Sequence, residues 1–178
     1  MIDPAIGSLL AGAFAVLFAS AAFHKARRFA HFAAVFRAYR LVPPALPVSG
    51  LVPMLEFAVA AGLLLPAVRP AAAVSGAAVL LLYAAAIGVN LQRGRHELSC
   101  GCGGPDERRP IAAWMVVRNV MLAILLAAAA LPWAARALQA ADYLTVAGGM
   151  AVAALLYMSA DRLLGQVVPR TASWGDAP

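Results

Sequence analysis

Long apolar runs separated by short polar connections dominate the pattern of this sequence. An α-helix needs about 20 mostly apolar residues to cross a bilayer. Five runs approach that length, at about 5–23, 48–68, 70–91, 111–131 and 141–159. The first is expected to end abruptly at His24-Lys25. We therefore predict an all-α fold, a polytopic membrane bundle of about five transmembrane helices.

The segment between the first two runs has a different pattern. Aromatic residues recur there at spacings of three and four, with arginines between them: Phe29, Phe32, Phe36 and Tyr39 alternate with Arg27, Arg28, Arg37 and Arg40. This pattern is typical of an amphipathic helix lying in the headgroup region. We predict such a surface helix at about 27–41, ended by the prolines at 43, 44 and 47.

The remaining polar segments define the domain organisation. A single bundle is expected over residues 1–160, and a loop at 92–110 carries both cysteines of the chain. Residues 161–178 contain Arg, Pro and Gly, so we expect a flexible tail there.

Composition agrees with a membrane protein and excludes other classes. Hydrophobic residues make up 63% of the chain, charged residues only 12%, and the mean hydropathy is +0.83. A soluble domain keeps about a quarter of its residues charged. The net charge of +6 does not indicate nucleic-acid binding, because the basic residues lie in short loops beside apolar runs.

The positions of Lys and Arg also predict an orientation. Eleven of them fall in the first loop, the cysteine loop and the tail, which share one face, and only Arg69 and Arg136 lie on the other. The positive-inside rule then places the N-terminus outside and the cysteine loop in the cytoplasm.

Cys100 and Cys102 are separated by one glycine, so they cannot staple distant segments together. A disulfide across Cys-Gly-Cys closes a small strained ring, and strain makes a disulfide labile and oxidising. Redox exchange is the leading interpretation. Two alternatives are a pair of reduced thiols in a flexible loop, and a copper or zinc site formed by His96 with both thiolates.

A second set of unusual residues lies inside the apolar runs. Glu56 and Arg118 are predicted at nearly equal depth, roughly 10–12 Å below the cysteine-loop face. Tyr83 is at similar depth, and Asn119 is adjacent to Arg118. Charges in hydrocarbon are costly unless paired, so we predict a Glu56–Arg118 ion pair. The four residues could hold a membrane quinone, or the pair could simply lock two helices together.

These motifs, in this order, resemble the MauE family of methylamine-utilisation membrane proteins, relatives of the DoxX-like four-helix proteins. The resemblance covers about residues 5–131 and rests on Leu55-Glu56, Arg93-Gly94-Arg95, Cys100-Gly101-Cys102-Gly103-Gly104 and Val117-Arg118-Asn119, with His24-Lys25 at the end of the first helix. It implies a DoxX-like core of four helices with a fifth transmembrane helix beside it. It also implies a role, beside a thioredoxin-like partner, in maturing the disulfide-rich small subunit of methylamine dehydrogenase.

The sequence thus leads to one main hypothesis, a membrane thiol–disulfide redox protein that acts with a thioredoxin-fold partner on a secreted, disulfide-containing client. A non-enzymatic assembly factor or membrane anchor is the alternative, and metal handling is a third. Disulfides form outside the cytoplasm, whereas the charge count places the cysteines inside. Either the count misleads, or the protein passes electrons across the membrane.

Overall fold

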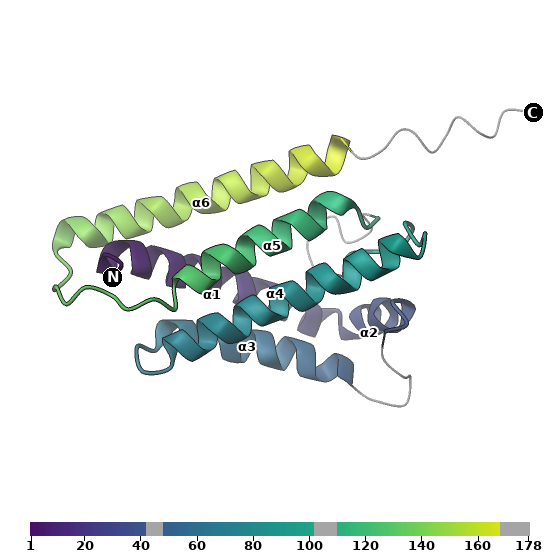
Figure 1. Cartoon of the computed structure of the whole chain (residues 1–178), viewed down its shortest axis with the longest axis horizontal. Coiled ribbons are helices and arrows are strands. Elements are labelled where there is room, and N and C mark those ends of the chain that lie inside the picture. Colours follow the sequence, from purple (N-terminus) through teal and green to yellow (C-terminus); the bar gives the residue numbers. More distant parts are fainter. Residues whose placement is uncertain (42–47, 102–109, 168–178) are drawn as a thin grey trace, which may run out of the picture.

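The computed structural model describes residues 1–41, 48–101 and 110–167, and this part of the chain is predominantly helical (Figure 1). Its helices are α1 (Pro4–Arg27), α2 (Phe29–Ala38), α3 (Leu51–Leu64), α4 (Arg69–Gln92), α5 (Ala113–Ala128) and α6 (Ala140–Val167), and a 3-10 turn at Val48–Gly50 leads into α3. The only pairings of β type among the described residues are two isolated bridges, Ile2 with Trp133 and Ser99 with Pro110. The all-α prediction is confirmed.

Four helices form the core of the molecule. Helix α1 packs against α3, α3 against α4, α4 against α5, and α5 touches α1 to close the ring. Large buried side chains from all four meet inside it: Phe14 and Phe18, Val59 and Leu63, Leu80, and Leu126. Gly76 permits close approach of α4 to its neighbours, because a Cβ there would lie 2.7 Å from Leu126 and 2.9 Å from Val59.

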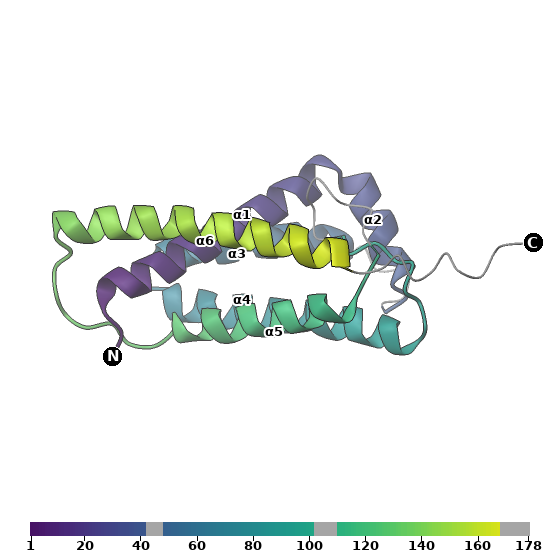
Figure 2. The same cartoon turned by 90° about the horizontal axis from the view of Figure 1, so that it is seen from above.

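Helix α6 lies outside this ring, alongside α1 (Figures 1 and 2). Its apolar side chains, among them Leu144, Leu155 and Leu156, are exposed, as expected of a helix that faces lipid. The predicted arrangement of a four-helix core with one further helix is therefore confirmed.

Three helical stretches are long and apolar enough to span a bilayer, namely Pro4–Arg27, Arg69–Gln92 and Ala140–Ala160. The stretches Val48–Leu64 and Ala113–Ala128 are apolar but shorter. All five predicted runs are thus helical, although their bounds differ.

Two differences in the bounds matter. The first run does not end at His24-Lys25, because α1 continues to Arg27 and buries Lys25. Helix α6 continues to Val167, so the start of the predicted tail is helical, while 168–178 lie outside the described residues.

The predicted surface helix is α2, and it lies across one end of the bundle (Figure 2). It presents Phe32 to the interior, while Phe29 and Arg37 are exposed. The end of α4 and the start of α5, which flank the cysteine loop, are at this same end (Figure 1). We call it the cysteine end of the bundle.

Candidate functional site

The backbone on both sides of the cysteine loop is fixed at the mouth of the bundle. Ser99 and Pro110 form an antiparallel bridge that joins the two arms of the loop. The hydroxyl of Tyr39, at the end of α2, donates to the carbonyl oxygens of Ser99 at 3.1 Å and Cys100 at 3.4 Å. Cys100 is half-buried and packs against the apolar cluster around Tyr39 and Ile87. Helix α2 therefore positions the first cysteine.

Cys100 is disulfide-bonded in the structure. Cys102, the other cysteine of the sequence, lies outside the described residues. Gly101 adopts a φ of +66°, a conformation that favours glycine, and a Cβ there would lie 3.0 Å from Val35 Cγ1. The glycine between the cysteines is thus favoured both by the backbone turn and by the proximity of α2.

Arg95 holds the start of the loop against α2. Its guanidinium donates to the Asn90 side chain at 2.9 Å and to the backbone carbonyl oxygen of Ala38 at 2.6 Å. Asn90 is fully buried. Arg95 therefore ties α4 to the end of α2.

Burial at this junction changes the acidity of one group outside the spans. The ring of Tyr39 is buried, and desolvation of its phenolate raises the pKa of Tyr39 to about 12. The hydroxyl therefore remains a hydrogen-bond donor to the cysteine segment through the whole physiological pH range.

Beneath this junction, three polar side chains from three core helices meet. Lys25 Nζ of α1 lies 2.5 Å from Glu56 Oε1 of α3, and the Tyr83 hydroxyl of α4 donates to the same oxygen at 2.7 Å. Lys25 is 4% exposed and Glu56 1%. We call these residues the Lys25–Glu56–Tyr83 cluster. Tyr83 lies roughly 10 Å along α4 from Asn90, which is bonded to Arg95.

The cluster has an apolar surround and one unused acceptor. Lys25 Nζ lies over the rings of Phe32, at 5.7 Å, and Tyr83, at 5.1 Å. Glu56 Oε2 is buried and has no hydrogen-bond partner among the described residues. A buried carboxylate oxygen that lacks a partner is costly, so this oxygen marks a position where a polar ligand would be stabilised.

The predicted Glu56–Arg118 ion pair is wrong, because Glu56 pairs with Lys25. Equal depth does not bring two residues together when their helices are diagonal in the ring, and α3 packs against α1 and α4 rather than α5. Arg118 instead lies over the rings of Trp114, at 5.1 Å, and Tyr157 of α6, at 6.0 Å.

The other predicted site residues are distributed as follows. Tyr83 joins Glu56, as the shared depth suggested, whereas Asn119 donates to the backbone carbonyl oxygen of Met115 within its own helix. His96 is exposed. No group of three or more His, Cys, Asp or Glu side chains that could hold a metal ion occurs within 1–41, 48–101 and 110–167, a range that excludes Cys102.

The sequence prediction did not identify Lys25 as the buried partner of Glu56, although the spacing of buried residues in α1 indicates it. The buried face of α1 includes Pro4, Ala11 and Phe18, at intervals of seven residues. Lys25 is the next position in that series and so lies on the face that packs against α3. A cation that continues a buried stripe requires an acidic partner on a neighbouring helix.

Fold and site together define a helical membrane protein that carries a cysteine-bearing loop at one end, above a buried ionic cluster. The family model described as "Methylamine utilisation protein MauE" matches residues 3–134, which include α1 through α5 and both cysteines. The chain belongs to the MauE family of methylamine-utilisation proteins.

Curated relatives support this assignment over nearly the full length. A methylamine utilization protein MauE of Paracoccus versutus is 42% identical over 176 residues, covering 96% of this chain and 95% of the relative. The protein of the same name from Paracoccus denitrificans is 36% identical, covering 97% and 95%. That from Methylophilus methylotrophus is 34% identical, covering 92% and 88%. No solved structure matches the chain.

Proposed function

We propose that this protein is a membrane thiol–disulfide redox protein that uses Cys100 and Cys102 to oxidise a thioredoxin-fold partner. The partner in turn supports maturation of a secreted, disulfide-containing client, such as the small subunit of methylamine dehydrogenase. The observation that carries the proposal is the disulfide-bonded Cys100, whose backbone carbonyl oxygen accepts a hydrogen bond from the Tyr39 hydroxyl at the cysteine end of the bundle. Membership of a methylamine-utilisation family supports the choice of client.

The exchange proceeds through a mixed disulfide. A thiolate of the partner attacks one sulfur of the Cys100–Cys102 disulfide, breaks that bond and forms an intermolecular disulfide. The partner's second thiolate then attacks the partner's first sulfur, which is bonded to this protein in the mixed disulfide. This step closes a disulfide in the partner and releases the dithiol form of this protein. Two electrons pass to the cysteine pair, which takes up two protons, and the partner becomes oxidised.

Reoxidation of the cysteine pair requires an acceptor, because the sequence contains no second pair of cysteines. We assign this role to a membrane quinone, which accepts two electrons and two protons. The Lys25–Glu56–Tyr83 cluster fits such a group, since Glu56 Oε2 is a buried acceptor for a hydroxyl and Lys25 is a buried donor for a carbonyl oxygen. Arg118 and Asn119, which the sequence also assigned to this pocket, are not among the residues that bind Glu56 in the described part of the chain.

The sidedness of the cysteine end belongs to the proposal as well. Lys25, Arg27, Arg37 and Arg95 lie at the cysteine end, which the positive-inside rule places in the cytoplasm. With that orientation the thioredoxin-fold partner meets the protein on the cytoplasmic side, and the secreted client is oxidised only if electrons are passed across the membrane. A membrane-impermeant maleimide added to intact cells after mild reduction would label the cysteines only if they face outward.

The decisive experiment is to trap the mixed disulfide. Cys100→Ser and Cys102→Ser variants are expressed with their natural partners, quenched in acid, alkylated and separated without reductant. We expect one of the two variants to carry a covalently attached thioredoxin-fold protein, identifiable by mass spectrometry and released by dithiothreitol.

The double variant Cys100→Ser, Cys102→Ser is the matched control and should capture nothing. The proposal fails if neither single variant captures a thioredoxin-fold protein and the double variant still supports maturation of the client. In that case the protein acts as an anchor, and the Lys25–Glu56 pair serves to hold α1 against α3.

A further inference from the structure

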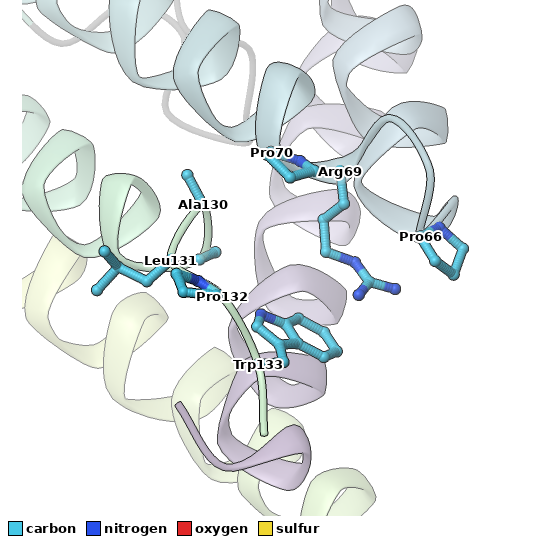
Figure 3. Close-up of a pocket in the computed structure, with 8 residues that line it drawn as sticks. Pro66, Arg69, Pro70, Ala130, Leu131, Pro132 and Trp133 are labelled. Carbon is cyan, nitrogen blue, oxygen red and sulfur yellow. The ribbon is translucent and has the colours of Figure 1, made fainter. Parts of the chain in front are cut away.

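A pocket at the end of the bundle opposite the cysteines has no role in the redox proposal. It lies between the turn from α3 to α4 and the segment that follows α5 (Figure 3). Its volume is about 340 Å³. Its lining is apolar except for one charged side chain: Pro66, Arg69, Pro70, Ala129, Ala130, Leu131, Pro132 and Trp133. Pockets of this size and composition are typical of small-molecule sites.

The guanidinium of Arg69 is held in a fixed position in this pocket. Its Nε donates to the carbonyl oxygen of Leu63 at 3.1 Å, and its central carbon lies 3.8 Å from the centroid of the Trp133 ring (Figure 3). Both terminal nitrogens lack a hydrogen-bond partner among the described residues. The two NH₂ groups are thus oriented but unused, the arrangement that binds an oxyanion through paired hydrogen bonds.

Trp133, which forms the floor under Arg69, is itself fixed. It forms a backbone bridge with Ile2, next to the start of α1. Its indole packs so closely on Gly7 that a Cβ there would lie 2.4 Å from the ring. The site is therefore preformed by three separate segments of the chain and does not depend on a mobile side chain.

The charges at this end also point to an anion. The other arginine, Arg136, is neutralised by two carboxylates, with ion-pair distances of 2.9 Å to Asp3 and 2.7 Å to Asp142. In the part of the chain that the structure describes, Arg69 has no carboxylate within ion-pair distance. Its positive charge is therefore available to a ligand.

We infer that this pocket binds the phosphate group of an anionic phospholipid. Arg69 would donate to the phosphate oxygens, and the apolar walls at Pro66, Leu131 and Pro132 would contact the glycerol and the first methylenes of the chains. Arginine and tryptophan at the end of a transmembrane bundle lie at headgroup depth, where a guanidinium can bind phosphate oxygens through paired hydrogen bonds. The inference is independent of the redox proposal.

Quenching of Trp133 by brominated lipids tests this inference. Trp114→Phe and Trp174→Phe leave Trp133 as the sole tryptophan reporter. This variant is reconstituted in phosphatidylcholine containing increasing fractions of brominated phosphatidylglycerol or, separately, brominated phosphatidylcholine. We expect brominated phosphatidylglycerol to quench Trp133 with roughly fivefold higher relative affinity, the preference that one basic residue near the surface supplies.

Arg69→Gln should abolish this preference. Arg93→Gln is the matched control, since Arg93 is an exposed arginine at the cysteine end, and it should leave the preference unchanged. Arg69→Lys keeps the charge without the planar pair of donors and should retain only part of the preference, which also covers the case in which Arg69→Gln does not fold. Equal quenching by both lipids, or a preference that survives Arg69→Gln, would overturn the inference. Displacement of the brominated lipid by millimolar inorganic phosphate would overturn the lipid assignment in favour of a free anion.

Discussion

The two ends of the bundle each contain an ionic network, and the two networks differ in almost every physical respect. At the cysteine end, Lys25 and Glu56 pair inside the ring with side-chain exposures of 3% and 1%. At the other end, Arg136 bridges Asp3 and Asp142 at the surface, with side-chain exposures of 39%, 40% and 17%. The first network lies among apolar side chains and the second is open to its surroundings.

Because their exposures differ, the two networks can contribute differently to stability and function. An ion pair that is exposed to water contributes little to stability and is screened by salt. The Arg136 network joins the start of α1 to the start of α6, and its contribution to stability is expected to be small. A pair in an apolar interior is costly to break, and charges at membrane depth usually serve a function. The orphaned Glu56 Oε2 adds to that argument, because a purely structural pair would be expected to satisfy both of its oxygens.

The largest effect is expected from breaking the buried pair. Lys25→Met or Glu56→Gln should each reduce the free energy of unfolding by about 3–5 kcal/mol, because each leaves a buried group without its partner. The variant that carries both substitutions should be more stable than either single variant. No charge would remain in it, and the amide oxygen that replaces the carboxylate would still accept from Tyr83. Reversible unfolding in mixed micelles, monitored by circular dichroism, measures all three.

A double-mutant cycle gives the interaction energy directly. If the two single losses simply add in the double variant, the two side chains are not coupled and the Lys25–Glu56 ion pair does not form. The same cycle with Glu56 and Arg118 should show no coupling.

A smaller effect is expected at the junction above the cluster. Tyr39→Phe removes the hydrogen bonds to the carbonyl oxygens of Ser99 and Cys100 and should cost about 1 kcal/mol. It should also speed amide exchange in 98–101, while exchange at the opposite end is unchanged. Exchange measured by mass spectrometry after peptic digestion reports both regions at once.

The raised pKa of Tyr39 gives the same contact a pH signature. The folded protein keeps the proton to about pH 12, whereas an unfolded tyrosine loses it near pH 10. The unfolded state therefore binds fewer protons between these values, and stability that is fully present below pH 10 is lost as the pH rises toward 12. The Tyr39→Phe variant should lack this part of the loss of stability at alkaline pH. If the free energy of unfolding depends on pH between 10 and 12 in the same way in the variant and the wild type, the burial of the Tyr39 hydroxyl is contradicted.

The smallest effect is expected from Arg136→Gln at the exposed network. Arg136 lowers the pKa of Asp3 through its hydrogen bond to that carboxylate. This interaction stabilises the fold above the ordinary pKa of an aspartate and is lost as the pH falls below it. The wild-type protein should therefore exceed Arg136→Gln in melting temperature slightly at neutral pH and low salt, and the two should converge in 1 M salt or at acidic pH. A difference as large as that of Lys25→Met would remove the contrast between the two ends.

Much of the fold could be predicted from the sequence because apolar runs encode helices directly. All five runs and the surface helix are present, and the grouping of Glu56 with Tyr83 followed from depth alone. Depth, however, fixes only one coordinate of a residue in a bundle. The partner of Glu56 depends on which helices are neighbours in the ring, and a single sequence does not specify that order.

The contacts of the cysteine segment were also beyond the sequence pattern. Tyr39 was assigned to an amphipathic surface helix, and nothing in its spacing indicated that its hydroxyl would bind the backbone sixty residues later. Arg95 likewise resembled one more basic loop residue. Its contact with Asn90 and with the end of α2 exists only because the helix folds back across the mouth of the bundle.

A redox titration of the purified protein shows whether the two cysteines form a redox-active pair. The protein is equilibrated in glutathione and dithiothreitol buffers of defined potential, acid-quenched and alkylated, and its free thiols are counted by intact mass. We predict that both thiols appear together in one two-electron step, with a midpoint between roughly −120 and −270 mV, the range of proteins that exchange disulfides. Thiols that stay reduced in the most oxidising buffer, or a disulfide that persists below roughly −300 mV as structural disulfides do, would contradict the claim.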